Sequence, residues 1–260
     1  MPMSATTSTA ESMAEARMSG AVPGLAETPP DLAAAYALQD AYAAAVARRA
    51  GGIAGYKLAV NGKAQMAHFG VREPVCARLF GAEIHASGAE LPRSRLPGLA
   101  VEVELAAILG EGVRRGAPFD RAAALAAIDR FHAAFELIDM GGRNLAATPL
   151  AEAVALNVFN VGAVLGAQSV PPGALDTGAI GVTLEIDGRQ VAEARGAAPQ
   201  DPVDAVAWLL GHLAGRGIAA EPGMVVLCGT HVPLTPVPPA ARQLRCTMTG
   251  LGEVRLSLLP

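Results

Sequence analysis

Two alternating runs of apolar and polar residues flank Asp187-Gly188, and this arrangement constrains the fold more than any other feature of the sequence. An Asp-Gly pair between alternating runs is the strongest short-range signal for a β-hairpin. Further strand-like segments follow at 224–230 and towards the C-terminus, with helical segments between them but no strict β-α-β rhythm. We therefore predict an α+β fold with a largely antiparallel or mixed sheet.

Helix start and stop signals, which include N-cap aspartates and terminal glycines, mark three segments. The expected helices run from Asp31 to Gly51, over residues 120–132, and from Asp201 to Gly215. Residues 1–30 are rich in Ser, Thr, Ala and Pro and offer few groups to bury. We therefore predict a flexible tail over residues 1–30.

Composition limits the partners that this chain of 260 residues can have. Its net charge is −4 with a pI near 5.7, so no basic surface favours nucleic acid or an anionic membrane. No run reaches the ~18 apolar residues of a membrane span, and the N-terminus does not resemble a signal peptide. Three separated cysteines form neither a disulfide framework nor a zinc motif. We expect a cytoplasmic protein that binds neither nucleic acid nor membrane.

Several common catalytic motifs are missing from the sequence. Gly62-Lys63 is not part of a P-loop, no serine lies in G-x-S-x-G, and no histidines form H-E-x-x-H. The Gly-Glu-Gly at 110–112 is too short for a dinucleotide-binding loop. These absences argue against hydride transfer, phosphoryl transfer and serine-hydrolase chemistry.

Residues 101–105 read Val-Glu-Val-Glu-Leu. On a strand, successive side chains point to opposite faces, so Glu102 and Glu104 project together. Their Cα atoms lie roughly 6–7 Å apart, and the carboxylates repel unless a positive group lies between them. One interpretation is an edge strand with a solvated acidic face; the other is a site for Mg²⁺ or Mn²⁺, which prefer oxygen ligands. A metal site needs a third carboxylate.

Three more polar residues are candidates for the same site. Glu136 interrupts an apolar run, so it is either the third metal ligand or the partner of an arginine. Lys57 is one of only two lysines beside 18 arginines, and an amine can lose its proton near neutral pH. It is either a proton carrier or an ordinary surface lysine. Thr230 follows Gly229, where its hydroxyl would hold a carboxylate or simply form a turn.

Seven segments, taken in order, resemble the 2-oxopent-4-enoate (vinylpyruvate) hydratase and 2-oxohexenedioate decarboxylase group of the fumarylacetoacetate hydrolase superfamily. They are GYKLAV (55–60), HFGVREPVCARLF (68–80), VEVELAAILG (101–110), FELIDMGGR (135–143), VLG (164–166), VVLCGTHVPLTPV (225–237) and GLGEVRLSL (250–258). Each segment is weak alone, but their order and spacing are specific. The resemblance extends from about residue 32 to the C-terminus.

The resemblance implies a functional site as well as a family. Glu102, Glu104 and Glu136 match the metal-binding positions, where Mg²⁺ or Mn²⁺ would bind. Lys57 matches the acid/base position, and Thr230 matches the contact to the carboxylate of a small 2-oxo acid substrate.

The fold implied by the resemblance is a mixed β-roll catalytic domain of fumarylacetoacetase type over residues 96–260. A smaller N-terminal α/β portion would cover residues 31–95, and the chain would form a homo-oligomer. Two segments depart from the family pattern, and one of them, Pro239-Ala240-Ala241 in place of Pro-Gly-Asp, is a loop change only. The other is more consequential. Residues 155–162 read ALNVFNVG, whereas many hydratases have a polar Asp-Asn-Ala-Ser segment there. This change bears on how the protein would handle water.

The implied activity is that of a metal-dependent lyase, a hydratase of aromatic catabolism that adds water to a short 2-oxo-alkenoate or its 2-hydroxydienoate enol. Three alternatives remain open from the sequence. They are a 2-oxo-enedioate decarboxylase, an acylpyruvate-type C–C hydrolase and a non-catalytic partner subunit of an active paralogue.

Overall fold

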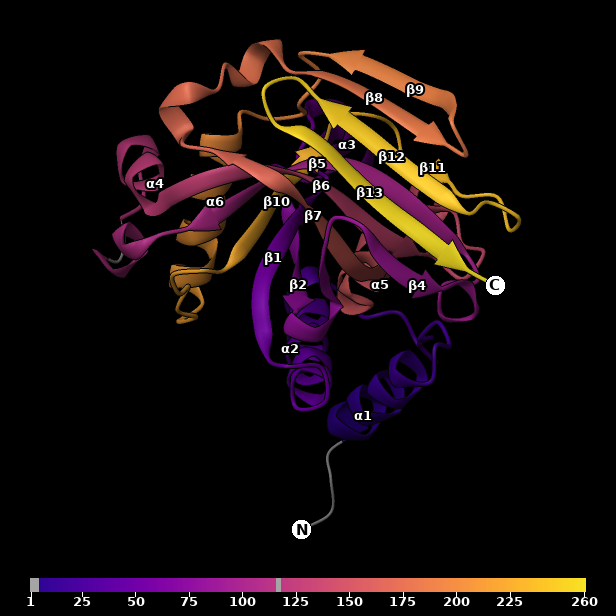
Figure 1. The fold of residues 1–260 in the computed structure, drawn as a ribbon. Coiled ribbons are helices and arrows are strands. Elements are labelled where there is room, and N and C mark those ends of the chain that lie inside the picture. The colour runs from indigo at the N-terminus through magenta and orange to yellow at the C-terminus, as the bar shows by residue number, and fades with distance from the viewer. Residues whose placement is uncertain (1–4, 116–117) are drawn as a thin grey trace.

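A large mixed sheet forms the centre of the computed structural model, which describes residues 5–115 and 118–260 (Figure 1). Its strand order is β2-β1-β10-β5-β6-β7-β3, and β11 pairs with β5. These strands are β1 (Ile53–Ala59), β2 (Val75–Phe80), β3 (Ile84–Ala86), β5 (Leu99–Leu109), β6 (Ile128–Asp139), β7 (Asn160–Val170), β10 (Val225–Thr230) and β11 (Thr235–Pro236). Strand β1 runs parallel to β10, whereas β5 runs antiparallel to both β10 and β6.

A smaller sheet, with the order β4-β13-β12-β8-β9, lies at one side of the large one (Figure 1). Its strands are β4 (Ala89–Pro92), β8 (Gly181–Ile186), β9 (Arg189–Arg195), β12 (Gln243–Met248) and β13 (Gly252–Leu259). Both sheets combine strands from before and after residue 95, since β1 pairs with β10 and β4 with β13. The domain boundary at residue 95 stays a prediction.

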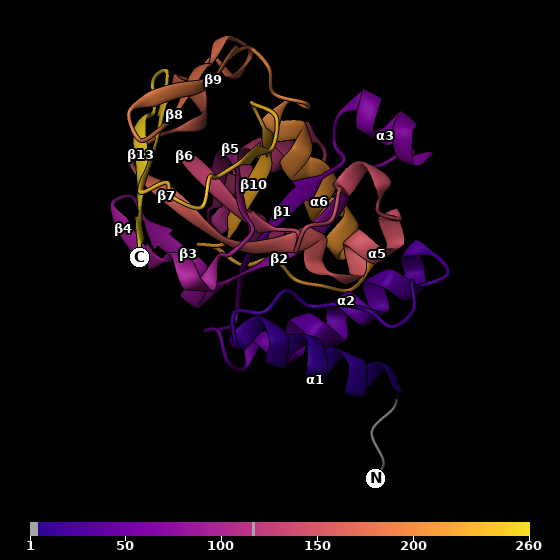
Figure 2. The same ribbon diagram turned by 90° about the vertical axis from the view of Figure 1, so that its right-hand side faces the viewer.

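The helices lie around the large sheet, and α1 and α2 lie side by side at one end of the molecule (Figure 2). Their bounds are α1 (Ala5–Met18), α2 (Leu32–Ala47), α3 (Lys63–Phe69), α4 (Arg121–Ala127), α5 (Leu150–Ala155) and α6 (Pro202–Gly215). The predicted caps are present, since the side chains of Asp31 and Asp201 accept hydrogen bonds from the first turns of α2 and α6. Within the described residues, no helix is long and apolar enough to span a membrane.

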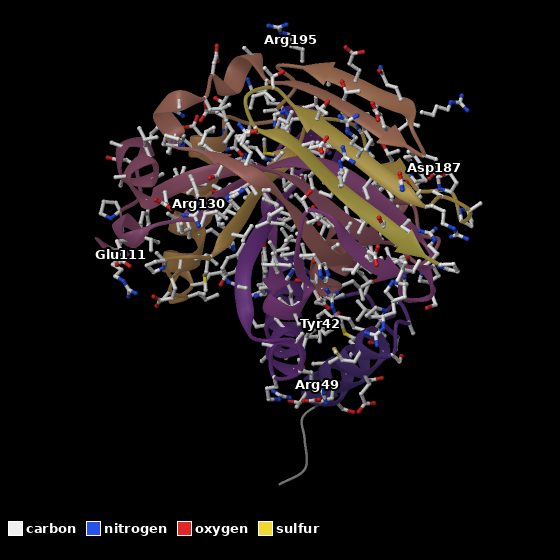
Figure 3. The ribbon with its side chains drawn as sticks, in the orientation of Figure 1. Tyr42, Arg49, Glu111, Arg130, Asp187 and Arg195 are labelled. Carbon is white, nitrogen blue, oxygen red and sulfur yellow. The ribbon has the colours of Figure 1, made fainter. Side chains whose placement is uncertain are left out.

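The predicted hairpin is confirmed at Asp187-Gly188, which joins β8 to β9. Both residues have positive φ angles, 51° and 75°, as a two-residue hairpin turn requires. The Asp187 carboxylate also accepts hydrogen bonds from the backbone N–H groups of Arg242 and Gln243, each at 2.9 Å. Figure 3 marks Asp187 at this end of the smaller sheet. The turn therefore joins β8 and β9 to the start of β12.

Helix α1 occupies much of the segment for which we predicted a flexible tail, residues 1–30. That prediction was wrong for this helix. Ala10, Met13 and Ala14 are spaced to share one helix face, and each is at most 2% exposed. They pack with buried residues of α2 in one apolar cluster. Small side chains allow the two helices to approach closely, so a segment with few large apolar residues still packs.

The helix predicted over residues 120–132 is also shorter than expected. Helix α4 ends at Ala127, and the chain continues as strand β6 from Ile128. The last five predicted positions were therefore wrong. Ile128 and Phe131 are buried three positions apart, which is a helix-like spacing, whereas Asp129 and Arg130 between them are exposed. The register between β5 and β6 shifts at Leu109, so a β-bulge at this end of β6 interrupts the alternation of the strand.

Candidate metal centre

Three carboxylates converge on two neighbouring strands of the large sheet. Glu102 and Glu104 lie on β5, and Glu136 lies on β6 directly opposite Glu102. One carboxylate oxygen from each residue lies within 4.8 Å of the others. Glu104 and Glu136 are at most 1% exposed, and Glu102 is partly buried. Because β5 is a central strand and the carboxylates are enclosed, the alternative of a solvated acidic edge does not apply.

Lys57 reaches this cluster from β1, with β10 between β1 and β5. Its Nζ lies 2.8 Å from Oε1 of Glu136, and its side chain is 2% exposed. It is therefore not a surface lysine. Glu136 pairs with this lysine, not with one of the many arginines considered as its partner in the sequence analysis.

A β-bulge in β10 gives the site a backbone donor. The register between β10 and β5 shifts between Leu227 and Thr230, which releases Gly229 from the regular ladder. The Gly229 N–H donates a hydrogen bond to Oε2 of Glu104. Gly229 has φ +115°, and a Cβ there would lie 2.6 Å from the side-chain nitrogen of Asn61. Only glycine fits this position without displacing its neighbours.

Two buried polar atoms at the centre lack partners among the described residues. Asn160 donates a hydrogen bond from Nδ2 to Oε1 of Glu136, at 3.0 Å. Oε2 of Glu136 and Oδ1 of Asn160 have no hydrogen-bond partner. An unpaired carboxylate oxygen in an enclosed site is costly, so Oε2 is available to a cation.

The electrostatics of the centre favour a divalent cation. Burial, together with the neighbouring Glu136, raises the pKa of Glu102 to about 7. Burial also raises the pKa of Glu104 well above its usual value, although the Gly229 N–H opposes this shift. Three ionised carboxylates beside one ammonium leave a net charge of −2, which one divalent ion would cancel. The donor set consists of carboxylate oxygens, which suits Mg²⁺ or Mn²⁺.

Burial and charge act in opposite directions on Lys57. Burial lowers the pKa of the amine, but Glu136 and Glu102 outweigh burial and raise it above its usual value. In the protein without an ion, Lys57 is therefore an ammonium group. A cation bound to the same carboxylates would weaken their hold on the proton and leave burial as the main influence.

Thr230 lies beside the three carboxylates but uses its hydroxyl elsewhere. It pairs with Glu104 across β10 and β5. The hydroxyl donates to the backbone oxygen of Val232 at 2.5 Å. Thr230 also lines the small cavity over the centre, with a volume of about 40 Å³. Thr230 therefore lines the cavity, but its hydroxyl proton is already engaged.

Sequence comparison identifies the family of the chain that carries these residues. A profile of the "Fumarylacetoacetate (FAA) hydrolase C-terminal" family matches residues 61–258. The chain belongs to this family. The matched segment contains Glu102, Glu104, Glu136 and Thr230, while Lys57 lies just before it. The predicted superfamily is confirmed.

Several curated proteins are similar to this family member over most of their length. The 2-oxo-hept-4-ene-1,7-dioate hydratase of Escherichia coli is 29% identical over 192 residues, which are 71% of this chain and 70% of the hydratase. The 4-oxalocrotonate decarboxylase of a Pseudomonas species is 28% identical over 205 residues, covering 78% and 77% of the two chains. The 2-hydroxypent-2,4-dienoate hydratase of Pseudomonas putida is 32% identical over 169 residues, covering 64% and 75%.

Solved structures confirm the predicted fold class. The 4-oxalocrotonate decarboxylase from Pseudomonas putida G7, complexed with magnesium and adipate, has a TM-score of 0.83. It is 23% identical, and the match covers 98% of this chain and 97% of that chain. Fumarylpyruvate hydrolase from Pseudomonas aeruginosa, in complex with Mn²⁺ and pyruvate, has a TM-score of 0.55 at 19% identity, covering 78% and 88%.

Sequence reasoning missed Asn160 and Gly229 as parts of the site. Asn160 is fully buried in residues 155–162, a segment in which apolar side chains predominate. The argument applied to Glu136, a polar residue inside an apolar run, would have singled it out too. Gly229 acts through its backbone at a bulge, and no side-chain pattern signals that role.

Proposed function

We propose that this family member is a metal-dependent lyase that adds water to a short 2-oxo-alkenoate or its 2-hydroxydienoate enol. The observation that carries the proposal is the enclosed cluster of Glu102, Glu104 and Glu136 with Lys57 in contact. Relatives named as hydratases and as a decarboxylase support a lyase reaction. A non-catalytic subunit would have no use for these converging charges, so the cluster argues against that alternative.

Glu102, Glu104 and Glu136 would hold the ion, which is Mg²⁺ or Mn²⁺ in this proposal. When bound, the ion supplies a Lewis acid that polarises the oxygen atoms of a 2-oxo acid. The solved relatives in complex with magnesium and with Mn²⁺ support this choice of metal. The orphaned Oε2 of Glu136 supports it independently.

Lys57 moves the proton in this proposal. Its Nζ is 2.8 Å from Glu136 and faces the same enclosed space as the carboxylates. The pKa of Lys57 is raised while the carboxylates are unneutralised and falls when a cation neutralises them. The amine can therefore give up a proton to substrate carbon and recover it during one reaction cycle.

The lining of the small cavity favours a substrate with one carboxylate. Lys57 is the only cationic residue among the described residues that line it, and it is already paired with Glu136. The other lining side chains include the apolar Met140, Leu145 and Leu234 and the uncharged amides of Asn61 and Gln65. A second carboxylate at the far end of a substrate would be buried without a cationic partner, which is costly. An uncharged alkenoate tail suits these walls.

The cavity must widen to admit such a substrate. Its volume of about 40 Å³ leaves room for roughly three waters. A five-carbon 2-oxo acid is larger than this space. Met140, directly after β6, and Leu145, in the loop that follows, line the cavity, so their side chains are the ones we expect to move.

A decarboxylase acting on a 2-oxo-enedioate is the second candidate. The observation in its favour is the wall formed by Val158 and Phe159, because apolar side chains stand where many hydratases have a polar segment. A decarboxylase needs no group that activates water. The missing cation for a second carboxylate weighs against it, and for this reason we place the hydratase first.

The test is a comparison of two substrate classes. Purified enzyme with Mg²⁺ or Mn²⁺ is given 2-hydroxypenta-2,4-dienoate or a 2-oxo-enedioate, and dienol absorbance and CO₂ release are followed. The proposal expects the dienol absorbance of the monocarboxylate to disappear without release of CO₂. After treatment of the enzyme with a chelator, the absorbance should not change. CO₂ release from the enedioate as the main reaction would instead establish the decarboxylase. No turnover of either class would contradict both.

We further infer a homo-oligomer located in the cytoplasm. Membership of the family supports the oligomer, since the resemblance to that family implies a homo-oligomer. Light scattering on the purified protein measures the oligomeric state, and a monomer at micromolar concentration would contradict this inference.

A further inference from the structure

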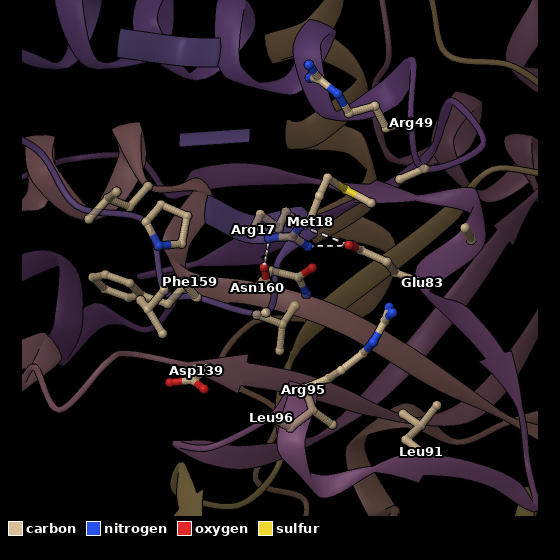
Figure 4. Close-up of a pocket in the computed structure, with 18 of the residues that line it drawn as sticks. Arg17, Met18, Arg49, Glu83, Leu91, Arg95, Leu96, Asp139, Phe159 and Asn160 are labelled. Atoms are coloured by element: carbon tan, nitrogen blue, oxygen red, sulfur yellow. Dashed lines mark hydrogen bonds and ion pairs between the residues drawn. The ribbon is translucent and has the colours of Figure 1, made fainter. Parts of the chain in front are cut away.

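A buried arginine on α1 lies one hydrogen bond away from the segment that supports the metal centre. The side chain of Arg17 is 6% exposed. Its Nε donates to Oε1 of Glu83 at 2.9 Å, and its Nη2 also contacts that carboxylate. Its Nη1 donates to the backbone oxygen of Asn160 at 2.5 Å. Figure 4 shows Arg17 between Glu83 and Asn160, in the wall of a cavity of about 430 Å³ beneath α1.

Asn160 connects this arginine to the carboxylate cluster. Its backbone oxygen accepts from Arg17, and its side-chain amide donates to Glu136 at 3.0 Å and to the backbone oxygen of Gly162 at 3.2 Å. Asn160 is fully buried. Both the backbone oxygen and the side-chain amide of Asn160 are therefore held by hydrogen bonds. A shift of its backbone would move the amide away from Glu136.

The backbone immediately before Asn160 is strained. Residues 157–159 have φ angles of 55°, 47° and 58°, in the left-handed region that side chains with a Cβ disfavour. Such a conformation persists only where surrounding contacts hold it, and it is common at functional sites. Asn157 supplies one hold, because its side chain bonds both the N–H and the C=O of Arg78 on β2. Arg17 supplies the other contact, to the backbone oxygen of Asn160 at the end of this segment.

Glu136 needs this support because little else orients it. Its Oε1 contacts Lys57 and Asn160, and its Oε2 has no partner among the described residues. The direction of Oε2 thus depends on how Oε1 is held. Lys57 alone is a single point charge, and a carboxylate can rotate about such a contact. The Asn160 amide adds a second, directional contact.

We infer that Arg17 and Asn160 are positioning residues for the metal centre. Arg17 fixes the backbone of Asn160, and the amide of Asn160 fixes Glu136 so that Oε2 faces the ion. Helix α1 is then part of the metal-binding machinery although it contributes no ligand. This inference rests on the proposed function in one respect, because it takes Glu136 as a metal ligand.

The test is the affinity for Mn²⁺, measured by electron paramagnetic resonance of the free ion, on purified full-length variants whose folding is checked by circular dichroism. Asn160→Ala should weaken Mn²⁺ binding by about tenfold or more, which is typical for loss of a partner that orients a ligand. Arg17→Met combined with Glu83→Gln should weaken it by roughly threefold to tenfold, since the support is lost one step further away. The combined change avoids leaving Glu83 without its cation.

Glu83→Gln alone is the matched control. It removes the ion pair but keeps the contact between Arg17 and the Asn160 backbone, so Mn²⁺ affinity should stay within about twofold of wild type. If the Arg17→Met combination does not fold, Arg17→Lys takes its place, because lysine keeps the charge but cannot reach both partners in a fixed fork.

The outcomes separate this inference from the proposed function. Wild-type Mn²⁺ affinity in Asn160→Ala, or in folded Arg17 variants, would overturn the positioning role and leave α1 a purely structural element. Wild-type affinity in Glu102→Gln would contradict the metal centre itself. Weakened binding in both the Asn160 and the Arg17 variants, with Glu83→Gln unchanged, is the result that the inference requires.

Discussion

Each charge at the metal centre depends on its neighbours for its protonation state. Lys57 is held as an ammonium by Glu136 and Glu102 against the effect of burial, while burial and the neighbouring carboxylates raise the pKa values of Glu102 and Glu104. The sequence indicated Glu136 as a charge in an apolar run, and Glu102 and Glu104 by their alternation on a strand. It indicated Lys57 as one of only two lysines. It could not predict their protonation, because that follows from distances between three strands.

Substitution of Lys57 tests its role as proton carrier. Lys57→Arg keeps the positive charge but cannot deprotonate, so kcat should fall by about 10² to 10⁴, nearly as far as in Lys57→Ala. Lys57→Ala should bind Mn²⁺ at least as tightly as wild type, because a competing cation has been removed. Steady-state kinetics with the 2-hydroxydienoate measure the first effect.

The other lysine of the chain provides the control for this substitution. Lys63 is exposed at the start of α3, and Lys63→Arg should leave kcat unchanged. A fully active Lys57→Arg enzyme would remove Lys57 from the mechanism.

The raised pKa values of the carboxyl groups predict how metal and pH act together on stability. A carboxyl whose folded-state pKa lies above its unfolded value stabilises the metal-free protein at low pH, and this contribution is lost as pH rises through the folded-state value. For Glu102 that value is about 7. Metal binding needs ionised carboxylates. The increase in Tm on adding Mg²⁺ or Mn²⁺ should therefore grow between pH 5.5 and 8.

Differential scanning fluorimetry at several pH values measures this increase. Glu102→Gln should show a much smaller metal-dependent increase in Tm at every pH. An increase that is constant with pH, or largest at acidic pH, would contradict the assigned protonation states.

At the scale of single elements, the sequence predicted what local chemistry determines. The Asp-Gly turn and the aspartate caps of α2 and α6 are local signals, and all three are present. It failed at α1 and at β6, where tertiary packing decides. Helix α1 is held by small buried residues and by Arg17, and a register shift interrupts the alternation at the start of β6. Neither circumstance is visible in a window of neighbouring residues.

Removal of α1 should therefore be costly. Deletion of residues 1–18 removes the buried Met13 and exposes the apolar face of α2, and loss of a buried methionine side chain alone costs about 2–5 kcal/mol. Urea unfolding followed by circular dichroism measures the free energy. Glu11→Gln is the control, because Glu11 joins α1 to α2 only through Arg48 and Arg49 at the surface, and it should cost at most about 1 kcal/mol. A deletion as mild as this control would show that α1 contributes little.

At the scale of the whole molecule, the site exists because distant segments meet in one sheet. Strand β10 inserts between β1 and β5, which brings Gly229 to Glu104 and leaves Lys57 within reach of Glu136. Sequence order alone does not predict that insertion, since β1 and β10 are separated by most of the chain. The resemblance to the family predicted the fold class, which is confirmed, and the ligand set, which stays a prediction. It did not predict the bulge in β10 or the contacts of α1.

The most direct test of the metal centre is a titration of the purified, chelator-treated protein with Mn²⁺ at pH 8, followed by isothermal calorimetry. The account predicts one site per chain with an affinity that falls by at least about tenfold in Glu102→Gln, while the circular dichroism spectrum stays unchanged. Equal Mn²⁺ affinity in wild type and in folded Glu102→Gln would contradict it.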